Sequence, residues 1–309
     1  MRIVRQTALG GSEVLELVEV GRPEPGPTEV LVRMSAAGVN PVDWKTRARG
    51  VFLGEPPFTL GWDVAGVVEE VGYGVTRFAE GDRVFGMPRF PREAAAYAEY
   101  VTSPSRQLAR TPEALSDVEA AALPLAGLTA WQALVETADV SAGTRVLILA
   151  AAGGVGHLAV QIAKARGAHV IGTASGAKHG FVTSLGADEV VDYTTDDVAD
   201  RARDVDVLLD TIGAETGAGA LRALRDGGLC VTLAGASLGS LAEAGGDRVR
   251  VVGLLVEPDR AGLEALASLA GEGALRPHVA QTFPLGDAAR AHALSESGHV
   301  QGKLVLTVG

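Results

Sequence analysis

A glycine-rich turn is the clearest chemical feature of this 309-residue sequence. The turn spans residues 150–156 (AAAGGVG) and lies between a predicted strand, Arg145 to Leu149, and a predicted helix that continues through Arg166. Glycine here lets backbone amides approach a pyrophosphate, and the helix N-terminus adds partial positive charge. Gly156 is expected to allow close packing of the helix on the strand, although Ala151 replaces the first glycine of G-x-G-x-x-G. A turn of this composition could serve packing alone, but its placement favours a dinucleotide site at Ala152, Gly153, Gly154 and Val155.

The residues after the next predicted strand favour NADPH over NADH. Sites that prefer NAD place an acid about 20 residues beyond the glycine turn, where it accepts hydrogen bonds from the ribose. No Asp or Glu occurs between His157 and Ala187. Thr173, Ser175 and Lys178 instead offer hydroxyls and an ammonium group, which suit a 2′-phosphate. The alternative is that Lys178 is only a solvated residue on the first turn of a helix.

The composition excludes several other classes of protein. The 27 Lys and Arg against 38 Asp and Glu give a net charge of −11, which argues against a nucleic-acid partner. Cys230 is the only cysteine, so neither an internal disulfide nor a cysteine-rich zinc site is expected, and a reducing cytoplasm fits. The charged N-terminus lacks the apolar core of a signal peptide, and glycines interrupt the longest uncharged run, Val146 to Ala163. We therefore expect no membrane association.

Two patterns of predicted elements divide the chain. Up to about residue 120, short apolar runs separated by Gly and Pro predict an antiparallel, barrel-like β domain with few helices. At Ser116 and Glu119, an S-x-x-E capping box opens an alanine-rich helix. Beyond it, strands alternate with helices, which predicts a parallel sheet. Its six expected strands are Arg145 to Ala150, His169 to Thr173, Glu189 to Val191, Val205 to Asp210, Leu229 to Leu233 and Val249 to Val256.

Several segments together resemble the zinc-free medium-chain dehydrogenase/reductases of the NADPH:quinone oxidoreductase type. They are residues 37–45 (AGVNPVDWK), 60–68 (LGWDVAGVV), 81–86 (GDRVFG), 127–131 (GLTAW), the glycine turn, and 302–306 (GKLVL). The resemblance implies an α/β fold with three parts. These are a GroES-like β-barrel domain (1–122), a doubly wound Rossmann domain with a parallel six-stranded sheet (123–257), and a C-terminal segment (258–309) that returns to the first domain.

The resemblance also implies chemistry without a metal. Zinc-dependent relatives place a cysteine where this chain has Asn40, and a G-H-E motif where it has Gly61-Trp62-Asp63. Without a Lewis acid, hydride from NADPH must go to an acceptor that is already electrophilic, such as a quinone or an activated enone. The leading hypothesis is therefore quinone reduction, with enone reduction as the alternative. A non-catalytic NADPH-binding protein is the competing class.

The resemblance places Asn40, Asp43 and Lys45 beside the nicotinamide as catalytic candidates. Asp43 and Lys45 could equally form a structural ion pair or cap a helix start, and core packing is the better interpretation of Trp62. Further cofactor contacts are implied by the resemblance at Thr129, Tyr193, Ala234, Leu254, Val256 and Lys303. Lys303 could instead protect the edge of a terminal strand.

A homodimer is expected from the apolar sixth strand of the parallel sheet. This strand would lie at an open edge, and pairing of two identical edges would satisfy the exposed backbone groups of both chains. The alternative is a monomer in which Arg248 and Arg250 protect the edge.

Overall fold

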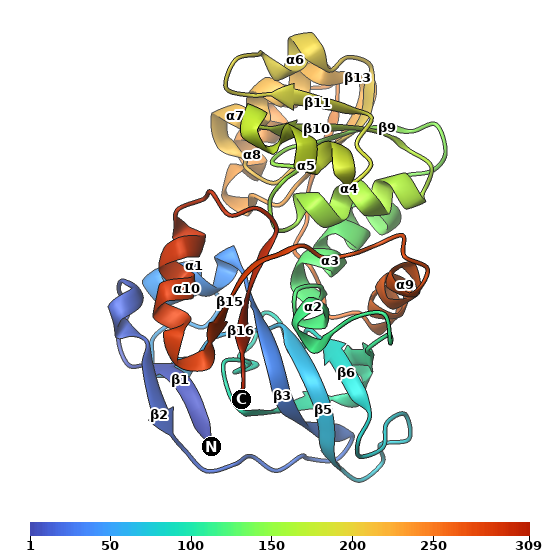
Figure 1. Cartoon of the computed structure of the whole chain (residues 1–309). Coiled ribbons are helices and arrows are strands. Elements are labelled where there is room, and N and C mark those ends of the chain that lie inside the picture. The colour runs from blue at the N-terminus through green and yellow to red at the C-terminus, as the bar shows by residue number, and fades with distance from the viewer. The chain divides into compact units, whose positions relative to one another are not determined.

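The computed structural model describes the whole chain, residues 1–309, and divides it into two compact units (Figure 1). Unit 1 comprises Met1–Leu128, Glu257–Gly273 and Pro277–Gly309, and unit 2 comprises Thr129–Val256 and Ala274–Arg276. The first segment of unit 1 thus ends at Leu128. None of the helices combines the length and hydrophobicity needed to cross a bilayer.

Unit 1 is built on two β-sheets. Its strands are β1 (Arg2–Gln6), β2 (Glu16–Glu19), β3 (Glu29–Val39), β4 (Phe58–Thr59), β5 (Val64–Val71), β6 (Arg83–Gly86), β7 (Tyr100–Pro104), β8 (Leu108–Arg110), β15 (Val279–Pro284) and β16 (Lys303–Thr307). A three-stranded sheet has the order β2-β1-β4, and a seven-stranded sheet has the order β15-β16-β3-β5-β6-β8, with β7 also paired to β3. Only the β15–β16 pair is parallel. This architecture agrees with the expected GroES-like domain.

Strand β3 joins the two ends of the chain. Its last residues pair antiparallel with β16, so that Leu304 lies opposite Val39 and Thr307 opposite Ala36. Figure 1 shows the C-terminal strands, in red, beside this blue strand. The shared core includes Val32, Leu304 and Leu306, all buried. The C-terminal residues Glu257–Gly273 and Pro277–Gly309 therefore belong to unit 1.

Helix α1 (Pro41–Arg49) of unit 1 was not predicted from the sequence. The other helices of unit 1 are α2 (Asp117–Ala121), α3 (Pro124–Trp131, which ends in unit 2), α9 (Arg260–Gly271) and α10 (Ala288–Glu296), with short 3₁₀ turns at Ser12–Val14, Ser105–Gln107 and Leu285–Asp287. Helix α1 begins with Pro41, whose missing N–H costs nothing in the first turn, and ends at Gly50 in a left-handed conformation (φ 67°). The predicted capping box opens α2, where Glu119 N donates to Ser116 Oγ at 3.2 Å.

Unit 2 contains one parallel six-stranded sheet with the order β11-β10-β9-β12-β13-β14, the strand order of a Rossmann fold. Its strands are β9 (Arg145–Ile148), β10 (His169–Ala174), β11 (Glu189–Asp192), β12 (Val205–Asp210), β13 (Leu224–Thr232) and β14 (Arg250–Gly253). Its helices are α4 (Gly156–Ala165), α5 (His179–Ser184), α6 (Val198–Arg201), α7 (Ala214–Ala220) and α8 (Leu238–Gly245), with a π-helical segment at Gln132–Thr137 and short 3₁₀ turns at Gly176–Lys178, Leu221–Ala223 and Gly235–Ser237. The doubly wound fold is confirmed.

The sixth strand is shorter than predicted. The apolar run suggested Val249 to Val256, but β14 covers only Arg250–Gly253. Leu254 N still donates to Thr232 O of β13 at 2.9 Å, and the chain then leaves the sheet before Pro258. As predicted, this strand lies at one edge of the sheet.

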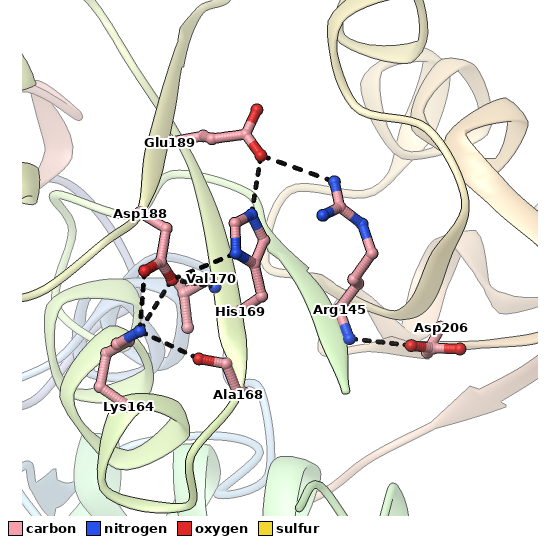
Figure 2. A network of polar contacts seen from close by, with 8 residues as sticks. All are labelled: Arg145, Lys164, Ala168, His169, Val170, Asp188, Glu189 and Asp206. Carbon is pink, nitrogen blue, oxygen red and sulfur yellow. Dashed lines mark hydrogen bonds and ion pairs between the residues drawn. The ribbon is translucent and has the colours of Figure 1, made fainter. Parts of the chain in front are cut away.

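Ion pairs fix the amino ends of the strands in unit 2 (Figure 2). Lys164 Nζ of α4 donates to both carboxylate oxygens of Asp188, at 2.9 and 2.8 Å, and Asp188 also accepts from Val170 N of β10 at 2.7 Å. His169 Nε2 of β10 lies 2.7 Å from Glu189 Oε1 of β11. The network is formed by Arg145, Lys164, Ala168, His169, Val170, Asp188, Glu189 and Asp206. The ion-pair network therefore does not occupy the carboxyl ends of these strands, which is where parallel sheets of this kind bind their ligands.

Candidate functional site

The glycine turn between β9 and α4 has the geometry of a dinucleotide-binding turn. Thr173 of β10 holds its start, because Ala150 N donates to Thr173 Oγ1 at 3.1 Å and Ala151 N donates to Thr173 O at 2.9 Å. A Cβ atom at Gly156 would lie 2.2 Å from Ala150 O, so only glycine lets α4 start this close to the strand. The turn therefore fits a pyrophosphate at the N-terminus of α4.

The predicted phosphate-binding residues lie where β10 ends. Thr173 is buried, while Ser175 and Lys178 are half-buried at a 3₁₀ turn in which Lys178 N donates to Ser175 O at 2.8 Å. Within unit 2, the structure thus brings Ala152, Gly153, Gly154, Val155, Thr173, Ser175 and Lys178 to the carboxyl ends of neighbouring strands.

An acid that the sequence analysis missed also lies here. The register of β10 and β11 pairs Ala174 with Asp192, and a Cβ added to Gly176 would lie 2.8 Å from Asp192 Oδ2. The hydroxyl and N–H of Thr194 donate to Asp192 and lower the pKa of its carboxyl. Asp192 lies beyond Ala187, farther along the chain than the acid of a site that prefers NAD. Strand pairing, rather than sequence spacing, brings this one to the loop.

The other proposed cofactor residues lie in three places. Tyr193 is 55% exposed after β11, and Ala234, Leu254 and Val256 follow β13 and β14 at the same edge of the sheet. Thr129 is buried in α3. Lys303 belongs to unit 1, where it opens β16. Their contact with a cofactor stays a prediction.

Lys303 is the centre of a buried polar cluster in unit 1. Its side chain is only 2% exposed, and its ammonium group donates to Val39 O at 2.9 Å and to Asn40 Oδ1, and lies 3.4 Å from Asp63 Oδ2. Asn40 Nδ2 donates to Asp63 Oδ2 at 2.8 Å, and Leu125 N donates to Asp63 Oδ1 at 2.7 Å. Asn40 and Asp63, which lie in the segments compared with the zinc-binding motifs, thus supply oxygen atoms to the ammonium group of Lys303. No group of three or more His, Cys, Asp or Glu side chains is arranged to hold a metal.

Asp43 adjoins this cluster in the first turn of α1. Its Oδ2 accepts from Asn40 N at 2.6 Å and from the Tyr97 hydroxyl at 3.1 Å, whereas its Oδ1 is buried without a hydrogen-bond partner. Burial, together with the charge of Asp63, raises the pKa of Asp43 to about 7, although the Asn40 N–H, the Lys303 charge and Tyr97 oppose the shift. The helix-cap interpretation of Asp43 is therefore correct, and it leaves a carboxyl that titrates near neutrality.

Tyr97 connects Asp43 to α10. The Tyr97 hydroxyl lies 3.1 Å from His292 Nε2, and His292 Nδ1 lies 3.3 Å from Arg47 Nη1. Arg47 in turn forms an ion pair with Glu296, with 2.7 Å between Nη2 and Oε1. Burial and the charge of Arg47 lower the pKa of His292 to about 3, so this imidazole is neutral. No sequence pattern signals this connection, because its members come from distant segments.

Lys45 does not join the polar cluster. It is exposed, with its ammonium group 5.5 Å from the centre of the Trp44 ring, and no ion pair links it to Asp43. Trp62 is a core residue, as expected: it is fully buried and donates to Arg92 O at 2.7 Å. Cys230 is buried in β13, and burial raises the pKa of its thiol to about 12.

Comparison with known proteins identifies the family. The model of the alcohol dehydrogenase GroES-like domain matches residues 26–113, and that of the zinc-binding dehydrogenases matches residues 185–306. A 2-haloacrylate reductase of Burkholderia sp is 37% identical over 326 residues, covering 95% of this chain and 94% of that protein.

Solved structures agree with this assignment. The quinone oxidoreductase from Coxiella burnetii has a TM-score of 0.95 and 37% identity, covering 100% of this chain and 99% of that one. The Escherichia coli quinone oxidoreductase complexed with NADPH has a TM-score of 0.89 and 32% identity, covering 99% of this chain and 100% of that one. The class is thus that of the NAD(P)H oxidoreductases. The chain belongs to the medium-chain dehydrogenase/reductase superfamily, and its relatives include quinone oxidoreductases.

The raised pKa of Asp43 predicts a pH-dependent stability difference. The native carboxyl keeps its proton up to about pH 7, whereas the unfolded carboxyl, with its ordinary pKa of 3.8, loses its proton at lower pH. Raising the pH from 5 to 8 should therefore destabilise the wild type relative to Asp43→Asn by roughly 2–3 kcal/mol. Urea unfolding at both pH values measures this difference.

Asp82→Asn is the matched control. Hydrogen bonds from Arg110 and from Ala79 N lower the pKa of Asp82, so this carboxyl is ionised in both states throughout that range. Its replacement should change stability equally at the two pH values. Equal pH dependence of the wild type and Asp43→Asn would contradict the prediction.

Proposed function

We propose that this protein is a metal-independent, NADPH-dependent reductase of electrophilic small molecules, with quinones as the leading substrate class. The observation that carries the proposal is the glycine turn, where Gly156 lets α4 start against Ala150. It occurs in a chain that is similar over nearly its full length to quinone oxidoreductases. Activated enones are the second candidate class, favoured by the equal similarity to a 2-haloacrylate reductase.

The residues of unit 2 have distinct binding roles in this proposal. Backbone amides of Gly153, Gly154 and Val155 would bind the pyrophosphate, while Ser175 and Lys178 would bind the 2′-phosphate. Bound in this way, NADPH supplies a hydride to the acceptor. Holding the acceptor in position and excluding water would then supply much of the rate enhancement.

The polar cluster of unit 1 supports a mechanism without zinc. The oxygen atoms of Asn40 and Asp63 already bind the ammonium group of Lys303, and Trp62 replaces a histidine ligand with a core side chain. This donor set suits an ammonium group better than Zn²⁺, which prefers thiolate and imidazole. The acceptor must therefore be electrophilic without a Lewis acid.

The proposed activity is tested by the loss of NADPH absorbance with 1,4-naphthoquinone, with 2-chloroacrylate, with 3-buten-2-one and with no acceptor. We expect turnover with at least one acceptor, unchanged after dialysis against EDTA. Tight NADPH binding without turnover on any acceptor would support a non-catalytic NADPH-binding protein instead. Activity lost on chelation and restored by zinc would refute metal independence.

Lys178 provides a test of the cofactor preference. We expect wild-type protein to bind NADPH more tightly than NADH. Lys178→Glu should weaken NADPH binding by about 1.5–3 kcal/mol, the range of a charge-assisted hydrogen bond, and leave NADH binding nearly unchanged. Asp192→Asn should instead strengthen NADPH binding, because it removes a negative charge beside Gly176.

Calorimetric titration of both cofactors measures these effects. Arg203→Glu, at an exposed cation of the same unit, is the control for a general change in charge. Indistinguishable NADPH and NADH affinities in the wild type would refute the preference.

We also propose that the protein is a homodimer paired through β14. This strand pairs only with β13, and the guanidinium group of Arg248, an exposed residue before the strand, donates to Leu221 O at 2.6 Å. Arg250, the first residue of β14, is also exposed. The other edge strand, β11, starts at Glu189, within the ion-pair network. Pairing between copies of β14 would therefore bring fewer charged side chains together than pairing between copies of β11.

The hydrogen bond from Leu254 N to Thr232 O identifies the variant that tests the dimer. Because N–H directions alternate along a strand, Val251 directs its N–H to the open edge and Val252 directs its own toward β13. We expect a dimeric mass by light scattering at micromolar concentration and a folded monomer for Val251→Pro. Val252→Pro is the contrast, since it should destabilise unit 2 itself. A monomeric wild type would refute the proposal.

A further inference from the structure

A one-way series of hydrogen bonds ends at Asp43. Arg47 Nη1 can only donate, so His292 Nδ1, 3.3 Å away, must accept. The hydrogen of this neutral imidazole is therefore on Nε2, which donates to the Tyr97 hydroxyl at 3.1 Å. The Tyr97 hydroxyl then directs its own hydrogen to Asp43 Oδ2, at 3.1 Å. Every hydrogen in the series points toward Asp43.

The direction of the series distinguishes the two oxygens of Asp43. Oδ2 accepts from Tyr97 and also from Asn40 N at 2.6 Å, so both of its neighbours are donors. A proton on Oδ2 would face these donors, whereas Oδ1 has no partner in the protein. The proton of the neutral carboxyl therefore belongs on Oδ1.

A second buried atom beside Asp43 also lacks a partner. Trp44 Nε1, on the next residue of α1, makes no hydrogen bond. A buried polar atom without a partner destabilises the folded state, and such atoms are uncommon in native proteins. Two of the four buried side-chain atoms without a partner in the chain thus lie on adjacent residues of this turn of α1.

The charges that face Asp43 have opposing effects. Burial and Asp63 favour the neutral form, while Lys303, the Asn40 N–H and Tyr97 favour the carboxylate. On α10, His292 is neutral, and Glu296 is paired with Arg47. Asp43 can therefore hold and release a proton near neutral pH.

We propose that Asp43 supplies from Oδ1 the proton consumed in each reduction, and that Tyr97 and His292 are positioning residues that keep Oδ1 available for it. This inference rests on the proposed function, because only a reduction by hydride requires this proton. The hydride carries two electrons to the quinone or enone, which becomes an anion. The O–H bond of Asp43 then breaks, and an O–H or C–H bond forms on the product. Solvent reprotonates the carboxylate before the next turnover.

The pH dependence of kcat tests the proton donor. In the wild type, kcat should fall as the pH rises through the pKa of Asp43. Asp43→Asn should lower kcat and abolish this fall, which is the alkaline limb of the pH profile. Tyr97→Phe removes a hydrogen bond that stabilises the carboxylate, so the limb should move to higher pH by roughly one unit. A tyrosine with only a structural role would change the size of kcat but not the midpoint.

Matched variants distinguish a positioning role of Tyr97 and His292 from a role in packing alone. Tyr100→Phe, at a half-buried tyrosine of β7, should leave the midpoint unchanged. His292→Leu should shift it in the same direction as Tyr97→Phe, whereas His292→Gln, which can both accept from Arg47 and donate to Tyr97, should restore it. An unshifted limb in Tyr97→Phe, or a limb that persists in Asp43→Asn, would overturn the proposal.

Infrared titration of the protein without substrate distinguishes this proposal from the proposed function. The C=O band of a protonated carboxyl should disappear near neutral pH in the wild type, be absent in Asp43→Asn, and titrate at higher pH in Tyr97→Phe. If this pattern occurs but no acceptor is reduced, the proposed function fails while the assignment of the proton to Asp43 stands. If the band is absent in the wild type, the proton-donor proposal fails whatever the activity.

Discussion

The organisation of unit 1 depends on the hydrogen bonds made by the ammonium group of Lys303. This group joins the start of β16 to the end of β3 through Val39 O, and it lies beside Asp63, which accepts from Leu125 N in α3. A buried ammonium is stable only when its charge and donors are matched, and removing one partner leaves the other charge uncompensated. The cluster therefore specifies how the last strand of the chain docks against the first long one.

This cluster also limits the chemistry that the chain can perform. In a zinc enzyme the metal keeps an open position, from which it polarises a carbonyl oxygen. Lys303 instead directs its donors to oxygens of Val39, Asn40 and Asp63, and it is almost fully buried. It can neutralise Asp63 but has little capacity left to polarise a substrate. In the proposed reaction, activation must therefore come from the acceptor itself.

The sequence predicted the fold better than it predicted the site. Strand-forming runs, the glycine turn and the Ser116–Glu119 cap depend on local chemistry, and all three are confirmed. The approach of Asp192 to Gly176 depends on strand register instead, and the contact of Tyr97 with His292 depends on how α10 packs. Neither has a sequence spacing that could reveal it. The same limit concealed the role of Lys303, whose partners lie at the other end of the sequence.

Asp43 and Asp192 show how environment alone gives one side chain two roles. Asp192 is at the surface and receives two hydrogen bonds from Thr194, which favour the charged form. Asp43 also receives two hydrogen bonds, but burial and the nearby charge of Asp63 outweigh them. Hydrogen bonding therefore does not decide the outcome, since both carboxylates have it; desolvation does. A carboxyl group able to hold a proton at neutral pH thus arises only inside the folded unit, where α1, Tyr97 and the Lys303 cluster enclose it.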